Sequence, residues 1–440
     1  MDIIRIAKNG YSSGQALITQ TSLETPGMMK DSLIMLAGSL GSGAFVYIYQ
    51  LAMGVVLTPE DYGTMLSLTS LFVILSVFAQ AVSFTTARAT SIFKSEGRLS
   101  SIKGLWLVSS KVTIIIGVIG FILLCGLVPL IARFMGTSGY VNMFLVFGTL
   151  LFVFPLYSDW GIMQGLQWFV PLSISQVLWG FFRPALALLF VYFSLGLNGA
   201  LLALPISYGI TLLITHRALR KLSNEPTEKV KLSTFASYSC TVLLAMFAIT
   251  ALTNIDVVLA KHYLSAFDVG NYSAVSVLGR IAFQAPMGVA IAMFPKTTAA
   301  WVKADRHKRL FARAAILTLI IVIVICLIHG LSSTRIITVL FSEKYVSMAP
   351  YLLKYSLGMS FFALFYTALT YFLSLGQTKV TFAAVFMIAV QVGLIIAFHA
   401  NISQLVNVML VSGALSLVSI VPFFFWKSNP STKGEILTET

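Results

Sequence analysis

The sequence contains little charge. Only 10% of its 440 residues are charged, whereas 58% are hydrophobic. A water-soluble domain carries about 25% charged and about 45–50% apolar residues, so this chain lacks the polar side chains needed to cover a soluble surface. Extended disorder is excluded too, because so much apolar surface would not stay solvated. The composition therefore predicts a membrane protein.

Cysteine and catalytic motifs are also scarce. The three cysteines each lie inside an apolar run, which argues against a disulfide-stapled secreted scaffold. The five histidines are dispersed without metal-ligand spacing, and no Gly-x-x-x-x-Gly-Lys-Ser/Thr phosphate loop occurs. The chain has no large external loop with paired carboxylates. We therefore expect no enzymatic activity, no metal site and no bound cofactor.

Long apolar runs dominate the chain instead. A helix that crosses the bilayer core needs about 20 apolar residues, and twelve stretches qualify. They are 33–57, 64–87, 106–132, 141–163, 170–194, 197–215, 235–260, 271–295, 312–330, 351–375, 379–399 and 404–426. We therefore expect an all-α polytopic membrane protein with about twelve transmembrane helices. The polar segments 1–32, 217–234 and 427–440 are predicted to be a cytoplasmic N-terminal segment, linker and tail.

The basic residues predict the orientation. The chain has 29 Lys and Arg against 15 Asp and Glu, a formal charge of +14. With both termini in the cytoplasm, 22 of these cations fall on the cytoplasmic side and five on the other. This asymmetry is the positive-inside signal of a cytoplasmic-membrane protein, so the basic loops are assigned to topology and anionic lipid rather than to nucleic acid. Arg88, at the cytoplasmic end of the second span, is either such an anchor or a substrate ligand.

A short motif occurs twice. Leu57-Thr-Pro-Glu-Asp61-Tyr-Gly63 and Leu264-Ser-Ala-Phe-Asp268-Val-Gly270 share Leu, Asp and Gly at the same spacing. Each copy lies between two spans, where Asp is predicted to cap the second helix and Gly to supply a tight turn. Six spans precede the second copy and six include and follow it. We therefore predict two parallel six-helix lobes, 33–216 and 235–426, around a central cavity, as in a transporter.

Two arginines fall inside predicted spans. An ionisable side chain at the centre of a span costs roughly 2.5–3.5 kcal/mol, so it is a functional candidate. Arg183 precedes Pro184, where we expect the helix to bend, and shares a polar or small face with Gln176 and Gly180. No acidic residue lies at its depth in the same span. Arg280 shares the corresponding pattern with Ser276 and Gln284 in the eighth span.

Two acids also fall inside spans. Asp256 lies near the outer end of the seventh span, at a depth similar to that of Arg280. The two side chains either form a packing ion pair or take part in function, with Asp256 exchanging H⁺ or Na⁺. Asp159 lies near the cytoplasmic end of the fourth span, where it is either solvated or a second ion-coupling residue.

Several motifs resemble one transporter family. Gly161-Ile-Met-Gln164-Gly-Leu-Gln-Trp-Phe169, followed by Ser175-Gln176 and Leu197-Asn-Gly-Ala200, is similar to the polysaccharide-exporter branch of the multidrug/oligosaccharidyl-lipid/polysaccharide (MOP) flippase superfamily. Asn254-Ile-Asp256, Leu278-Gly-Arg280 and Phe294-Pro295 resemble the start of that branch's second lobe. The likeness covers roughly residues 30–430. This chain departs from the pattern at Asp159-Trp160, where related sequences often carry Arg.

The resemblance implies alternating access between two lobes and a polyprenyl-diphosphate-linked oligosaccharide as cargo. It also implies polysaccharide polymerase and glycosyltransferase enzymes as partners of a monomeric exporter. Arg183 and Arg280, one on each lobe, are suited to clamp a diphosphate by charge-assisted hydrogen bonds. Gln176 and Gln284 are suited to sugar hydroxyls. Either the membrane potential or an exchanged H⁺ or Na⁺ would supply the energy.

Two alternatives remain. An ion-coupled multidrug or organic-cation antiporter of the same superfamily would have the same helices, but organic cations prefer acidic cavities with aromatic walls. The arginines in the spans lie at least as deep as the acids, which favours an anionic cargo. A non-transport membrane scaffold or a scramblase would not need the arginine pair.

Overall fold

A computed structural model describes residues 26–137, 139–220, 222, 226–228, 230, 239–302 and 307–425. Most of the predicted segment 1–32, half of 217–234 and all of 427–440 lie outside the described residues. Within them the structure is helical. Its elements are α2 (Pro26–Val56), α3 (Pro59–Ser95), α4 (Leu99–Phe134), α5 (Tyr140–Gly148), α6 (Leu150–Gly165), α7 (Phe169–Tyr192), α8 (Gly196–Leu219), α10 (Ser239–Leu252), α11 (Ile255–Tyr263), α12 (Ala266–Gly279), α13 (Ile281–Gln284), α14 (Met287–Val302), α15 (His307–Leu340), the 3-10 helix η2 (Glu343–Met348), α16 (Ala349–Ser374), α17 (Val380–Ala397), α18 (Ile402–Ser419) and α19 (Val421–Phe425).

These helices confirm the predicted spans. Among the described residues, eleven helices are long and apolar enough to cross a membrane, and the bent pair α10–α11 makes a twelfth. That pair bends by 43° between Leu252 and Ile255. Much of α4 and α15 exposes leucine and isoleucine side chains, as expected of helices that face lipid. The chain is therefore an all-α multi-pass membrane protein.

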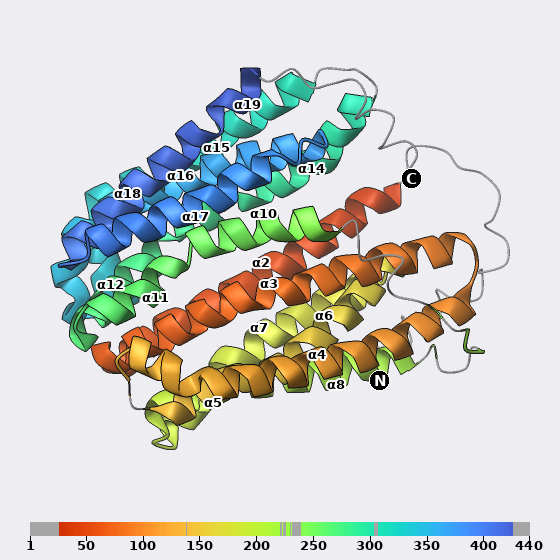
Figure 1. The fold of residues 1–440 in the computed structure, drawn as a ribbon, viewed down its shortest axis with the longest axis horizontal. Coiled ribbons are helices and arrows are strands. Elements are labelled where there is room, and N and C mark those ends of the chain that lie inside the picture. Colours follow the sequence, from red (N-terminus) through yellow and green to blue (C-terminus); the bar gives the residue numbers. More distant parts are fainter. Residues whose placement is uncertain are drawn as a thin grey trace.

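The helices form the two predicted lobes. Figure 1 shows α2–α8 as one bundle and α10–α19 as the other, inclined to each other so that they meet at one end. At that end α3 contacts α11 and α12 of the second bundle. We call these bundles the N-lobe and the C-lobe, and the end where they meet the closed end.

The repeated motif begins one helix in each lobe. Thr58 caps α3 by accepting a hydrogen bond from the backbone N–H of Asp61, and Ser265 caps α12 in the same way through Asp268, each at 3.2 Å. The prediction that Asp is the capping residue is therefore wrong. Thr58 and Ser265 are the N-cap residues. Asp61 and Asp268 occupy the first turn of their helices, where a negative charge interacts favourably with the helix dipole.

The motif glycines are also not turn residues. Gly63 and Gly270 lie inside α3 and α12, and neither has a positive φ. A Cβ on Gly63 would lie 2.6 Å from the backbone nitrogen of Gly270, and a Cβ on Gly270 would lie 2.0 Å from the carbonyl oxygen of Pro59. The two copies of the motif thus touch each other across the lobes. Glycine is needed because only a hydrogen fits between the two backbones.

Two lysines of the C-lobe reinforce the closed end. Lys344 donates hydrogen bonds to the carbonyl oxygens of Val55 and Leu57, at 2.8 and 2.7 Å, where α2 of the N-lobe ends. Lys261 donates to the hydroxyl of Thr64 on α3, at 2.9 Å. A cation at a helix C-terminus is favourable because the last carbonyls carry partial negative charge. The lobes are therefore joined by backbone contact and hydrogen bonds.

The linker between the lobes is anchored at the opposite end of the N-lobe. The carboxylate of Glu228 accepts hydrogen bonds from the hydroxyl of Ser101 and, at 2.6 Å, from Arg98. These hydrogen bonds hold the pKa of the Glu228 carboxyl below its usual value. A Cβ on Gly104 would collide with the carbonyl oxygen of Glu228, so this glycine lets the linker lie directly on α4.

Replacing Gly270 by alanine should destabilise the closed end. The added methyl must displace the backbone at Pro59, and overpacking of this kind costs about 1–3 kcal/mol. We expect a lower melting temperature of the detergent-solubilised protein. Gly43→Ala is the matched control, because no atom lies within 4 Å of a Cβ built there. Equal melting temperatures for the two variants would contradict the proposed contact.

Candidate functional site

The structure brings Arg280 and Asp256 together in the C-lobe. Arg280 stands at the break between α12 and α13 and is 7% exposed. Its Nη2 donates to Asp256 Oδ1 at 3.2 Å, and its Nη1 donates to Asn254 Oδ1 at 3.1 Å. Asn254 lies in the bend between α10 and α11. Two helix breaks therefore meet at one buried ion pair.

Two tyrosines complete this network. The hydroxyls of Tyr272 on α12 and Tyr355 on α16 both donate to Asp256 Oδ2, at 2.8 and 2.7 Å. The carboxylate, only 1% exposed, is thus fully hydrogen-bonded, and the packing ion pair considered from the sequence is present. The Nε of Arg280 has no hydrogen-bond partner among the described residues. The guanidinium keeps an unused donor while Asp256 holds it in place.

The predicted polar face of the eighth span does not continue to Gln284. Ser276 bonds to the Tyr355 hydroxyl at 3.0 Å and lies with Arg280 in the buried network. Gln284 is exposed, on the separate turn α13. The helix breaks at Arg280, between Ser276 and Gln284, so the i, i+4, i+8 spacing no longer describes one face. Pro286, which has no N–H, lies at the next break, between α13 and α14.

Arg183 is the corresponding buried cation of the N-lobe. It is 6% exposed on α7, and its guanidinium lies 4.2 Å from the ring centre of Tyr49 on α2, a cation–π contact. No carboxylate of the described residues forms an ion pair with it. Its Nε also has no hydrogen-bond partner there. Arg183 is therefore buried without a counter-charge.

Unsatisfied polar atoms follow one face of α7. Gln176 Oε1, Trp179 Nε1 and Arg183 Nε are all buried without a partner among the described residues. The spacing i, i+3, i+7 places them along one side of the helix. Gly180, predicted to share a face with Gln176 and Arg183, packs closely against α2, where its Cβ would lie 2.9 Å from Ser42 Cα. Since nearly all buried polar groups in proteins are hydrogen-bonded, this row indicates a binding surface.

A cavity opens beside this row. It has a volume of about 300 Å³ and lies between α3, α6 and α7; we call it the N-lobe cavity. Its lining consists of Gln80, Ser83, Phe84, Tyr157, Trp160, Gln164, Leu172 and Gln176. None of these described residues is charged. Of them the sequence identified only Gln176 as a site residue, because glutamines on three separate spans give no local signal.

Aromatic rings connect this cavity with Arg183. Trp160 lies 5.0 Å from Tyr157 and 6.1 Å from Trp179 between ring centres, and Trp179 lies 5.3 Å from Tyr208. Tyr208 is within electrostatic reach of Arg183. The aromatic rings thus run from a neutral cavity to a buried cation.

The remaining predicted residues lie elsewhere in the N-lobe. Asp159 is 1% exposed, so the view that it is solvated is wrong. Its carboxylate accepts hydrogen bonds from Trp106 Nε1 at 3.1 Å and Thr215 at 3.2 Å, and it lies 3.7 Å from His216 Nδ1. His216, on α8, was not singled out from the sequence. Arg88 is partly buried on α3 and does not line the N-lobe cavity. The ion-coupling roles of Asp159 and Asp256 stay predictions.

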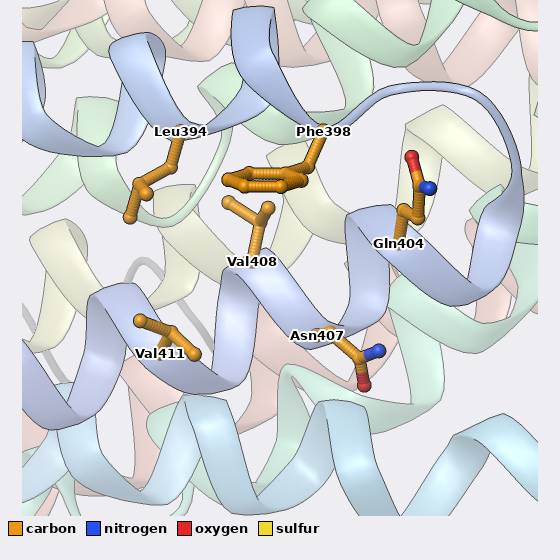
Figure 2. A pocket seen from close by; sticks show the side chains of 6 residues that line it. All are labelled: Leu394, Phe398, Gln404, Asn407, Val408 and Val411. Atoms are coloured by element: carbon orange, nitrogen blue, oxygen red, sulfur yellow. The ribbon is translucent and has the colours of Figure 1, made fainter.

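A second pocket lies between α17 and α18. Figure 2 shows Phe398 and Val408 facing each other across it, and its volume is about 170 Å³. Its other lining residues are Leu394, Gln404, Asn407 and Val411. None of the predicted site residues lines it, so the N-lobe cavity is the better candidate site.

Comparisons with known proteins identify the fold. No model of a known protein family and no curated protein matches the sequence. The fold is similar to an inward-facing multidrug-resistance MATE transporter of the MOP superfamily, with a TM-score of 0.74 and 15% identity over 90% of this chain and 95% of that one. The outward-facing conformation of a multidrug-resistance MATE transporter gives 0.66, with 16% identity over 92% and 98%. A MOP transporter from Pyrococcus furiosus, described as having a binding pocket of reverse polarity, gives 0.63, with 16% identity over 90% and 94%.

The chain therefore has the two-lobed fold of MATE transporters in the MOP superfamily. All three similar structures are transporters rather than enzymes. At identities of 15–16% they show the fold alone, and not the cargo of this chain.

Removing Asp256 alone should destabilise the C-lobe. Asp256→Ala leaves Arg280 buried and unpaired, which costs about 3–5 kcal/mol for such pairs. We expect a clear drop in the melting temperature of the solubilised protein, partly recovered in the double variant Asp256→Ala/Arg280→Met. Glu343→Ala, at an exposed position on η2, is the control and should melt like the wild type. A double variant that melts below the single one would contradict the pairing.

Proposed function

We propose that this chain, with its MOP-superfamily fold, is an alternating-access exporter of a polyprenyl-diphosphate-linked oligosaccharide across the cytoplasmic membrane. The observation that carries the proposal is Arg183: a buried cation that no described carboxylate neutralises, at one end of a row of unsatisfied polar atoms. A charge inside the membrane without a partner is expensive and marks a substrate path. An anionic headgroup supplies the missing counter-charge.

The two arginines are suited to grip that headgroup from both lobes. Arg183 and Arg280 each retain an Nε–H donor that no described residue uses. Helix α2 lies beside both: its Tyr49 stacks on Arg183, and its Tyr47 is within electrostatic reach of Arg280. Guanidinium groups bind phosphate through paired charge-assisted hydrogen bonds. In this arrangement Asp256 positions Arg280 rather than competing for the cargo.

The contact between the lobes supports a cargo-loading state. If the closed end faces outward, as the distribution of Lys and Arg predicts, the lobes separate toward the cytoplasm, where lipid-linked sugars are assembled. The higher TM-score with the inward-facing transporter than with the outward-facing one agrees with this state, 0.74 against 0.66. Export would then require the contacts of Gly63, Gly270 and Lys344 to separate.

The membrane potential is a sufficient driving force in this proposal. A diphosphate carries about two negative charges, and moving each outward releases about 2.3 kcal/mol per 100 mV, roughly 4–5 kcal/mol in all. Exchange of H⁺ or Na⁺ at Asp159 or Asp256 is the alternative source.

An organic-cation antiporter is the second candidate, because the similar structures include multidrug-resistance transporters. Such a cargo prefers acidic side chains together with aromatic walls in its cavity. The N-lobe cavity has aromatic walls but no acid among its lining residues, and Asp159 and Asp256 already accept hydrogen bonds from their neighbours. The anionic cargo therefore fits the chemistry better.

Flipping assays on Arg183 variants test the proposal. A hydrogen bond to a charged group contributes about 1.5–3 kcal/mol, so Arg183→Ala should slow export of a fluorescent farnesyl-diphosphate-linked oligosaccharide from proteoliposomes by about 10- to 150-fold. Arg183→Lys should restore part of the rate, because it keeps the charge but not the paired donors.

Arg335→Ala, at an exposed position on α15, is the control and should export at the wild-type rate. A wild-type rate for Arg183→Ala would overturn the diphosphate clamp. Accumulation of ethidium by the wild-type protein, with no export of the diphosphate probe, would establish the antiporter instead.

A further inference from the structure

We propose that the N-lobe cavity is a subsite for one uncharged sugar ring, and that it selects cargo whose sugar next to the diphosphate is neutral. This inference rests on the proposed function and adds to it the chemical class of the sugar. The evidence for it is the lining of the cavity, not the two arginines.

Three amides meet in the cavity from three helices. Gln80 comes from α3, Gln164 from α6 and Gln176 from α7, and Ser83 of α3 also lines the cavity. Each amide has both donor and acceptor groups, and so does each sugar hydroxyl. A ring of hydroxyls can therefore bond to all three glutamines, whereas an apolar drug ring would leave the buried Gln176 Oε1 unpaired.

On α7, beside the cavity, one hydrogen-bond acceptor and one donor are unsatisfied. Gln176 Oε1 is a buried acceptor and Trp179 Nε1 is a buried donor, and neither has a partner among the described residues. The two residues lie one turn apart on α7, and the Trp179 ring is 6.1 Å from Trp160 in the cavity wall. Buried polar atoms without partners are rare in native structures, so this pair indicates a hydroxylated ligand.

The cavity also has a fixed aromatic wall. Trp160 Nε1 donates to Ser175 Oγ at 2.9 Å, and that hydroxyl donates to the Leu172 carbonyl at 2.7 Å. These bonds hold the Trp160 indole in one orientation beside Tyr157. The exposed part of this fixed aromatic ring can contact the apolar C–H face of a sugar, at little entropic cost.

The volume suits one sugar rather than a whole oligosaccharide. A cavity of about 150 Å³ holds benzene, so about 300 Å³ accommodates one six-membered ring with its substituents. Gln176 and Arg183 are seven residues apart on α7, about 10 Å along the helix axis. One headgroup can therefore place its diphosphate at Arg183 and its first sugar in the cavity, with the later sugars outside.

The absence of charge from the described lining decides between sugar classes. An acidic sugar would bring a carboxylate into a cavity without a cation, since Arg183 is engaged by the diphosphate. An amino sugar with a free ammonium group would find no carboxylate. Burying either charge without a partner is unfavourable, so the cavity favours neutral hexoses and N-acetylated sugars.

Three probes test this subsite on the purified full-length protein: farnesyl diphosphate, farnesyl-diphosphate N-acetylglucosamine and farnesyl-diphosphate glucuronic acid. Their dissociation constants are measured by isothermal titration calorimetry in detergent. We expect the neutral sugar to tighten binding about tenfold over the sugar-free probe, and the acidic sugar to give no gain. Gln176→Leu and Trp160→Leu should each remove the gain while still binding the sugar-free probe.

Asn407→Leu, in the pocket between α17 and α18, is the matched polar-to-leucine control and should keep the full gain. Trp160→Phe should keep part of it, because an aromatic ring remains. Binding of the sugar-free probe with no gain from N-acetylglucosamine would overturn the subsite and leave the diphosphate clamp intact. A larger gain from glucuronic acid, or a full gain in Gln176→Leu, would also overturn it. Failure of all three probes to bind the wild type would overturn the proposed function itself.

Discussion

The cost of placing a charge in hydrocarbon organises this structure. Asp256 and Arg280 neutralise each other across two helix breaks, and Asp159 is surrounded by donors from α4 and α8. Each of these groups is held by side chains from other helices, so each also ties helices together. Arg183 is the exception, because a tyrosine ring is its neighbour where a carboxylate would be expected. Arg183, which has no carboxylate partner among the described residues, belongs to the N-lobe, and so does the polar cavity.

The closed end shows how two large lobes can be joined without being locked. Its contacts include a glycine-to-glycine approach, two lysine side chains on carbonyl or hydroxyl oxygens, and packed tyrosine and phenylalanine rings. Each contact is modest, and water or another partner can replace the hydrogen bonds when the lobes separate. Alternating access needs two states of similar free energy, and contacts of this kind allow that.

The proposed site divides its tasks between the lobes. The N-lobe combines one uncompensated cation with a neutral, hydroxyl-matching cavity, whereas the C-lobe holds its cation in a rigid network of tyrosines and Asp256. A lipid-linked sugar has the same asymmetry, with its charge in the diphosphate and its hydroxyls in the adjoining ring. Along α7, Gln176 lies at the cavity and Arg183 at the proposed diphosphate site. The sugar and the diphosphate follow each other in the same order along the cargo.

The spans, the two repeats and the two arginines inside the spans could be predicted from the order of residues alone. These features are local: a run of about 20 apolar residues specifies a membrane helix, and a charge within it stands out. Which polar residues meet depends on how the helices pack. This packing placed Gly63 against Gly270, joined Tyr355 to Asp256, buried Asp159 beside His216 and gathered three glutamines around one cavity. Contacts between distant helices have no periodicity along the chain, and a neutral glutamine or tryptophan in a span looks the same whether it packs or binds.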